Sequence, residues 1–237
     1  FALVVAALSA DRAAVGQQVD RAVLPIPDPP PVSVTELSAR DVKPPARFEV
    51  KAPQGAPNVV VVLLDDIGFG QSSAFGGPIQ MPTVERLASG GLRYNQFHTT
   101  ALCSPTRAAL LSGRNHHVNN AGAVMELATA FPGNTGIRPN DVAPLAEMLR
   151  LNGYSTAAFG KWHNGSQFPY HPNARGFDEY YGFLSGHWGL YFDTELDHNG
   201  KLERGKGFIS DDLTNHAMDF MAQHKANPFF CYLAFNT

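Results

Sequence analysis

The sequence of 237 residues has little cysteine and little charge of either sign. Its two cysteines are too few for a disulfide framework, and Cys231, inside the apolar run 229–233, is expected to fill the core. A net charge of -3 excludes nucleic-acid binding through bulk electrostatics, so any anion must be bound by a local site. No hydrophobic run is long enough to span a bilayer, and no internal repeat is visible. With 44% apolar residues, the chain is expected to form a globular protein with one sizeable core.

The chain divides into three segments. Residues 1–10 are apolar, and their small-residue end resembles the end of a secretory signal peptide. We therefore expect an exported protein, periplasmic or secreted, whose first residues are missing; an ordinary apolar helix is the alternative. Residues 11–56 are polar and rich in proline, which opposes helix and sheet, so we expect an extended arm. The folded domain is expected over residues 57–237.

Strands and helices alternate along this domain. The run 58–64 is β-branched and aliphatic throughout, which is typical of a strand buried on both faces of a parallel sheet. Residues 154–159 predict a second core strand, and 193–207 a polar excursion that varies with substrate. Further elements are expected over 82–88 (helix), 92–100 (strand), 141–151 (helix), 211–225 (helix) and 228–235 (strand). This alternation predicts an α/β fold with a largely parallel central sheet and helices on both faces.

Two adjacent carboxylates, Asp65 and Asp66, follow the first core strand directly. Ligands of open α/β sheets bind at the carboxyl ends of the strands. Neighbouring carboxylates repel each other unless a cation lies between them, and they suit a hard divalent cation. A turn with a helix cap is the alternative, but the sequence favours a metal site.

The segment 102–114 is typical of a helix that begins beside a cysteine. Ser104 can cap the helix, and Gly113 supplies a left-handed exit. Cys103 therefore lies at a helix N-terminus, where free N–H groups and the helix dipole favour negative charge. Arg107 is four residues further on and can add a positive charge on the same face. A buried cysteine at the start of a core helix is the alternative interpretation.

Two polar side chains, Lys161 and His163, follow the second core strand. Residues two apart in extended backbone point the same way, so we expect both side chains in the crevice of Asp65 and Asp66. A lysine can bind an anion there, and a histidine can transfer a proton near neutral pH. Taken alone, a Lys-x-His pair is weak and is usually structural.

Three motifs together resemble one family. Cys-Ser-Pro-Thr-Arg at 103–107, followed by Ala-Ala-Leu-Leu-Ser-Gly-Arg, resembles the C-x-P-x-R signature of the type I sulfatases of the alkaline phosphatase superfamily. Leu-Asp-Asp-x-Gly at 64–68 resembles the family's calcium motif. Gly-Lys-Trp-His at 160–163 resembles its second signature, whose lysine and histidine line the sulfate site. The resemblance covers 57–237 and implies the N-terminal portion of a catalytic domain with the alkaline-phosphatase-like fold.

The resemblance also implies an arylsulfatase-type sulfuric ester hydrolase. A formylglycine-generating or sulfatase-maturing enzyme would oxidise Cys103 to formylglycine. The hydrated aldehyde, polarised by Ca²⁺ or alternatively Mg²⁺, would then attack the sulfur of a small-molecule or carbohydrate sulfate ester. The implied metal ligands are Asp65, Asp66 and Cys103. The implied catalytic residues are Cys103, Arg107, Lys161 and His163, of which Lys161 and His163 would also bind the substrate.

Other site residues of the family would follow a strand similar to 228–235, and the chain ends first. We therefore expect an N-terminal fragment that leaves this strand as an unpaired sheet edge, folds poorly and turns over little substrate. A phosphonate or phosphate monoester hydrolase of the same superfamily is one alternative, since the site residues do not separate these esters from sulfates. A non-catalytic domain that binds Ca²⁺ and anions is another.

Overall fold

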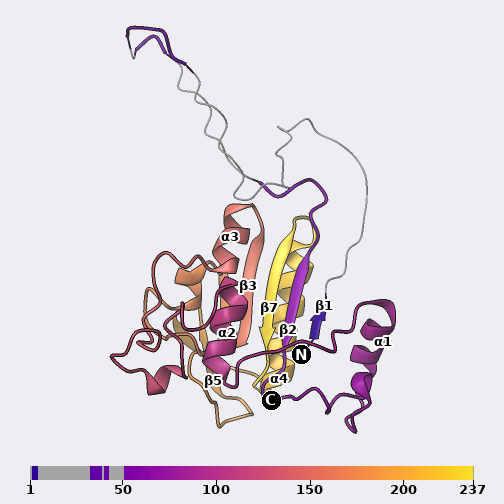
Figure 1. The fold of residues 1–237 in the computed structure, drawn as a ribbon. Helices are drawn as coiled ribbons and strands as arrows, with labels where there is room; N and C mark the ends of the chain where they lie inside the picture. The colour runs from indigo at the N-terminus through magenta and orange to yellow at the C-terminus, as the bar shows by residue number, and fades with distance from the viewer. Residues whose placement is uncertain (1, 5–32, 39, 43–50, 237) are drawn as a thin grey trace.

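The computed structural model describes residues 2–4, 33–38, 40–42 and 51–236. The expected signal-peptide segment 1–10 and arm 11–56 lie mostly outside these residues. The domain is built on a seven-stranded sheet in the order β1-β2-β7-β3-β4-β5-β6 (Figure 1). Its strands are β1 (Ala2–Val4), β2 (Val59–Leu63), β3 (Ser155–Lys161), β4 (Glu179–Phe183), β5 (Glu195–His198), β6 (Lys201–Arg204) and β7 (Phe229–Ala234).

The middle of the sheet is parallel and its edges are antiparallel. Strands β2, β7, β3 and β4 run parallel, whereas β1 on one side and the β5–β6 hairpin on the other run antiparallel to their neighbours. The last strand along the chain, β7, lies between β2 and β3 and is buried along its whole length. The expectation of an unpaired edge at 228–235 is therefore wrong. A strand that is apolar on both faces belongs in the middle of a parallel sheet.

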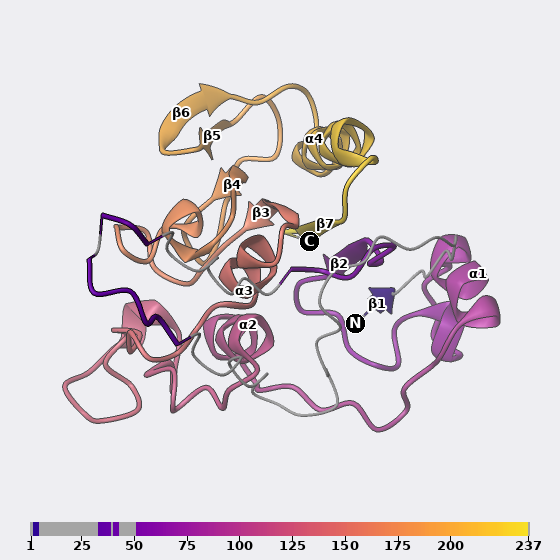
Figure 2. The ribbon, with the colours of Figure 1, turned by 90° about the horizontal axis from the view of Figure 1, so that it is seen from above.

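Helices cover both faces of the sheet, as predicted. The α-helices of the described residues are α1 (Pro82–Gly90), α2 (Cys103–Ser112), α3 (Leu145–Leu151) and α4 (Ile209–His224). Short 3-10 turns are η1 (Ser73–Phe75), η2 (Met125–Leu127) and η3 (Pro172–Arg175). Figure 2 shows α2 and α3 on one face, α4 on the other, and α1 beside the β1–β2 edge. Among the described residues, no helix has the length and apolar character needed to cross a membrane.

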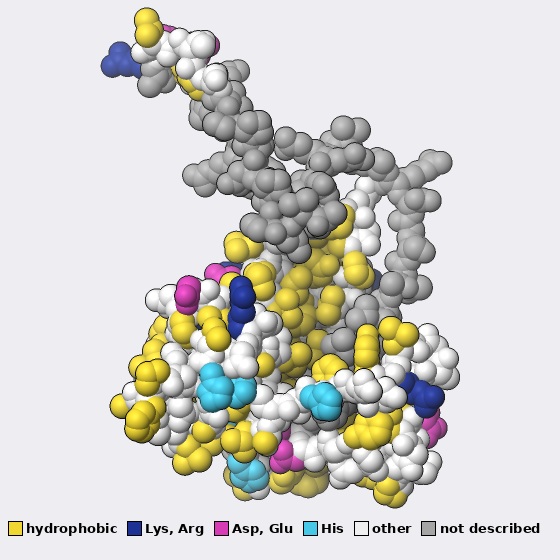
Figure 3. Space-filling view, viewed as in Figure 1, with side chains coloured by type: hydrophobic (Ala, Val, Ile, Leu, Met, Phe, Trp, Pro, Cys, Tyr) yellow, Lys and Arg dark blue, Asp and Glu magenta, His cyan; other side chains and the backbone are white. Residues whose placement is uncertain are grey.

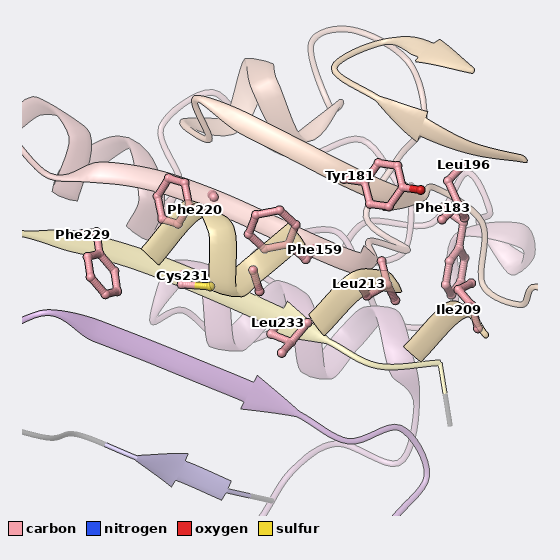
Figure 4. Packing of buried hydrophobic residues seen from close by; sticks show 12 residues of the cluster. Phe159, Tyr181, Phe183, Leu196, Ile209, Leu213, Phe220, Phe229, Cys231 and Leu233 are labelled. Carbon is pink, nitrogen blue, oxygen red and sulfur yellow. The ribbon is translucent and has the colours of Figure 1, made fainter. Parts of the chain in front are cut away.

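Alternate residues of β7 supply the two halves of the core. Cys231 and Leu233 face α4, where Leu213 and Phe220 pack against them together with Phe159 of β3 (Figure 4). The intervening residues of β7 face α2 and α3 in a second cluster. Cys231 is fully buried and fills the core as predicted. Two-sided burial of this strand explains why its sequence is a continuous apolar run.

Three elements differ from the sequence-based expectations. The strand expected over 92–100 is absent, and its aromatic residues Tyr94 and Phe97 are half exposed, so this segment has no buried face to pack against the sheet. Helix α3 begins at Leu145 rather than at 141, because Pro144 is the N-cap and the residue before a proline avoids helical backbone. The polar excursion 193–207 contains the β5–β6 hairpin, which extends the sheet.

The sheet requires glycine at Gly160, in β3. Gly160 has φ +97°, and a Cβ atom built there would lie 1.9 Å from the backbone oxygen of Ala234 in β7. We predict that Gly160→Ala lowers the free energy of unfolding by about 3–5 kcal/mol, because the paired backbones cannot separate without losing hydrogen bonds. Gly153→Ala is the control: its φ is +88° but the space is open, so only the backbone strain of about 1–2 kcal/mol is expected. Urea unfolding measures both, and equal losses would contradict the steric explanation.

Candidate active site

Polar and charged side chains meet at the carboxyl ends of the parallel strands. Asp65 and Asp66 follow β2, and Lys161 is the last residue of β3. Helix α2 begins at this edge with Cys103 as its first residue, and Arg107 lies one turn further on. The structure thus brings together five of the six side chains that the sequence singled out.

The Asp65 carboxylate holds two buried cations. Lys161 donates from Nζ to Oδ2 at 2.6 Å, and Arg107 donates from Nη2 to Oδ1 at 3.3 Å. Arg107 is only 1% exposed and Lys161 only 3%. Arg107 also donates from Nη1 to the backbone oxygen of Lys161 at 2.7 Å and to the Tyr232 hydroxyl at 3.4 Å. Since a buried cation without a partner is strongly destabilising, Asp65 is the residue that allows both cations to stay inside.

Asp66 and Cys103 complete a group of possible metal ligands. One ligand atom from each of Asp65, Asp66 and Cys103 lies within 4.8 Å of the others. The backbone of Asp66 has φ 53°, in the left-handed region that aspartate tolerates, and its carboxylate is exposed. Within the described part of the chain this carboxylate has no hydrogen bond or ion pair. Carboxylate oxygens suit Ca²⁺ or Mg²⁺, whereas a thiol is a soft ligand that does not. The group therefore fits a hard cation through its carboxylates.

The start of α2 differs from the prediction. The N-cap is Leu102, with extended backbone, and no side chain caps the helix. Ser104 lies inside the helix, fully buried, and its Oγ has no hydrogen-bond partner among the described residues. The N–H groups of Cys103 and Ser104 have no intrahelical acceptor and remain available to an anion. The left-handed exit at Gly113 is confirmed, with φ 65°.

His163 is hydrogen-bonded to Glu126 and has no described hydrogen bond or ion pair with Asp65, Lys161 or Arg107. Its φ of 51° is left-handed, so the extended backbone expected at this residue is wrong. Its Nε2 lies 2.8 Å from Oε2 of Glu126, and its Nδ1 is buried with no described hydrogen-bond partner. Burial lowers the pKa of His163, and although Glu126 opposes this change, the positive charges of Lys161 and Arg107 add to it. The imidazole is therefore neutral at neutral pH.

Sequence reasoning missed Glu126, which lies in η2. Although burial raises the pKa of Glu126, the hydrogen bond and charge of His163 together with backbone hydrogen bonds outweigh this effect and lower the pKa, so the side chain is ionised. Glu126 is the sole acidic residue between 121 and 140. The available signal in the sequence was a single carboxylate in a loop that has no other acidic residue. No local pattern shows that it meets a histidine 37 residues away.

Comparisons with known proteins agree with this geometry. The family model described as Sulfatase matches residues 57–237. The chain belongs to the sulfatase family. It is 32% identical to human (Homo sapiens) N-acetylgalactosamine-6-sulfatase, with 77% of this chain and 39% of that protein covered. It is 43% identical to mouse (Mus musculus) arylsulfatase G, with 56% of this chain and 25% of that protein covered.

Solved sulfatase structures share the fold. The structure of BT4656 in complex with its substrate D-glucosamine-2-N,6-O-disulfate matches with a TM-score of 0.63 and 30% identity. The match covers 76% of this chain and 34% of that one. The predicted α/β fold of the alkaline phosphatase superfamily is thereby confirmed. The chain spans about two fifths of the length of the N-acetylgalactosamine-6-sulfatases that it matches.

The two adjacent aspartates, Asp65 and Asp66, are expected to contribute differently to the stability of the fold. With calcium chelated, we predict that Asp65→Asn lowers the free energy of unfolding by about 3–5 kcal/mol, because Arg107 and Lys161 lose the charge that balances them. Asp66→Asn removes the same charge from an exposed side chain and is the matched control, with an expected change within about 0.5 kcal/mol. Denaturant unfolding measures both. Similar losses in the two variants would contradict the central position of Asp65.

Glu126 and His163 form a pair that can be titrated. Because Glu126 raises the pKa of His163 against the effect of burial, we predict that Glu126→Gln lowers this pKa further. Proton NMR of the His163 imidazole measures the change. Glu147→Gln removes the same charge from α3 and should leave the His163 pKa as it is. An unchanged or higher His163 pKa in Glu126→Gln would show that the pair does not persist in solution.

Proposed function

We propose that the protein is a sulfuric ester hydrolase of the arylsulfatase type, with residue 103 converted to formylglycine and with bound Ca²⁺. The observation that carries this proposal is the convergence of Asp65, Asp66 and Cys103 beside two buried cations. Membership in the sulfatase family supports it. Mg²⁺ is the alternative ion, since both ions prefer oxygen ligands.

The residues at the site would have complementary roles. Asp65 and Asp66 would hold the ion, which when bound polarises sulfate and nucleophile oxygens. Lys161 and Arg107 would place fixed positive charge where negative charge develops on the sulfate. The N–H groups of Cys103 and Ser104 would add to this charge at the start of α2. His163, neutral and with Nδ1 free of described partners, would accept or donate the proton that moves during ester cleavage.

The ligand chemistry of residue 103 supports the modification. An unmodified thiol is a poor partner for the hard cation that the two aspartates suit. Formylglycine in its hydrated form would supply hydroxyl oxygens in place of the sulfur, and with them the nucleophile for the sulfate ester. Such a residue requires a formylglycine-generating or sulfatase-maturing enzyme as a partner. We also propose that the protein is exported, to the periplasm or beyond the cell.

The substrate is proposed to be a small-molecule or carbohydrate sulfate ester. One relative is named for N-acetylgalactosamine-6-sulfate cleavage, and one structural neighbour holds a sulfated glucosamine as its substrate. These names support a sulfated sugar ahead of other sulfate esters. Both proteins are longer than this chain, so the support concerns the class of ester and not the particular sugar.

The first experiment is peptide mass spectrometry across Leu102–Arg107 of protein from its native source. We expect the mass of an aldehyde in place of the Cys103 thiol. An unmodified thiol in the mature protein would overturn the formylglycine nucleophile and favour a non-catalytic domain that binds Ca²⁺ and anions.

A second measurement separates the two ester classes. The protein at its full natural length is assayed with p-nitrophenyl sulfate and p-nitrophenyl phosphate, with calcium present and after chelation. We expect hydrolysis of the sulfate, and loss of that hydrolysis on chelation because Asp65 and Asp66 then hold no ion. Preference for the phosphate would assign the protein to phosphate or phosphonate ester hydrolysis instead.

A further inference from the structure

A cavity of about 480 Å³ is lined by His163 together with residues of β4, β5 and β6. It lies at the carboxyl ends of β3 and β4 and is closed on one side by the β5–β6 hairpin. Its volume is within the range of sites that hold one small organic molecule. His163 lines the cavity, is 4% exposed, and keeps a buried Nδ1 without a hydrogen-bond partner among the described residues. The cavity is therefore a place where a ligand group meets a proposed catalytic histidine.

The walls combine the aromatic rings of Trp188 and Phe183 with carboxylates. Trp188 lines the cavity; its ring stacks on Phe183 with centroids 5.8 Å apart, and its Nε1 donates to Thr194 at 2.8 Å. An aromatic face fixed in this way offers a flat apolar surface with little conformational freedom to lose on binding. The acidic residues that line the cavity are Glu126, Glu195 and Asp197. No lysine or arginine is among the residues lining it.

The register of the hairpin places its acids in the cavity. Residues directly opposite each other in an antiparallel ladder share a face, and neighbours along a strand alternate. Asp197 is opposite Leu202, and both line the cavity. Leu196 is opposite Glu203; Leu196 is buried against the α4 side of the sheet, so Glu203 lies on that other face. Arg204 is opposite Glu195 but does not line the cavity.

The three carboxylates differ in the hydrogen bonds that they make within the protein. Asp197 accepts hydrogen bonds from the Gly200 backbone at 2.8 Å and from His171 at 3.3 Å, so it is held by the protein. Glu126 is engaged with His163. Glu195 is exposed and has no hydrogen bond or ion pair with any described residue. Its carboxylate is available to accept hydrogen bonds from ligand hydroxyls, and it repels a ligand anion.

We propose that this cavity binds the sugar ring of a sulfated carbohydrate whose single sulfate is its only anionic group, and that its carboxylates reject a second sulfate or a uronate. This inference rests on the proposed function, which supplies the sulfate ester next to His163. The hydroxyls of the sugar ring donate hydrogen bonds to Glu195, and the apolar face of the sugar ring packs on Trp188. Selection comes chiefly from repulsion, because like charges brought together in a cavity cost more than a hydrogen bond gains.

Binding measured without turnover tests the cavity directly. The protein at its full natural length, carrying Cys103→Ala, is titrated calorimetrically with N-acetylglucosamine 6-sulfate and with D-glucosamine-2-N,6-O-disulfate. The two ligands differ only in a neutral acetyl or an anionic sulfo group on the ring nitrogen. We expect the monosulfated sugar to bind at least about tenfold more tightly. In Glu195→Gln this ratio should fall by about threefold or more, whereas Glu203→Gln, the same change on the other face of the hairpin, should leave it as it is.

The outcomes separate this inference from the proposed function. Absence of binding by both sugars, equal binding, or an equal effect of the two glutamate variants would each overturn the cavity proposal. Turnover of p-nitrophenyl sulfate by the unsubstituted protein is measured in parallel. Turnover without sugar selection would leave the proposed function standing and remove the cavity proposal. Sugar selection without turnover of any sulfate ester would support the cavity proposal and overturn the proposed function.

Discussion

The Asp65 carboxylate is the constraint on which the site depends. It joins β2 to Lys161 at the end of β3 and to Arg107 in α2, which are 96 and 42 residues away along the chain. Both cations are almost fully buried, and Asp65 is the carboxylate that balances their charge among the described residues, so removing it would leave two buried charges uncompensated. Arg107 extends the network to Tyr232 of β7, and all three central strands are thereby tied to one helix. The edge of the sheet is fixed before any ligand arrives.

The charges at this edge are close to balance in the protein alone. Asp65 and Asp66 offset Lys161 and Arg107, and Asp66 remains exposed without a described partner. A divalent cation held by the two carboxylates would leave the site with net positive charge, which is what a sulfate group requires. Cys103 lies at the same point, within 4.8 Å of both carboxylates. Metal binding and anion binding therefore depend on the same pair of aspartates.

Much of this arrangement follows from the sequence, and the exceptions have physical reasons. Apolar runs locate β2, β3 and β7, and the residues directly after β2 and at the end of β3 point to the site, because strand ends converge at one edge. The order of strands does not follow, since β7 is last in the chain and central in the sheet. The backbone at His163 is not the extended one expected, because its left-handed φ leaves no trace in the residue pattern. Glu126 was missed because only the tertiary fold brings its loop to the histidine.

The Asp65 network and the carboxylates of the cavity are supplied by different segments of the chain. The Asp65 network uses the ends of β2 and β3 and the start of α2, which lie at one edge of the sheet (Figure 1). On the face seen in Figure 3, charged side chains are few and scattered. The cavity walls come from the ends of β3 and β4 and the loops that follow them, from η2, and from the β5–β6 hairpin, which joins the sheet only through β4. A change in the hairpin can alter the charge of the cavity without touching Asp65, Arg107 or Lys161. On the proposals above, selection of the sugar can vary while the proposed ester-cleaving centre stays the same, which is the expected behaviour of peripheral segments on a rigid scaffold.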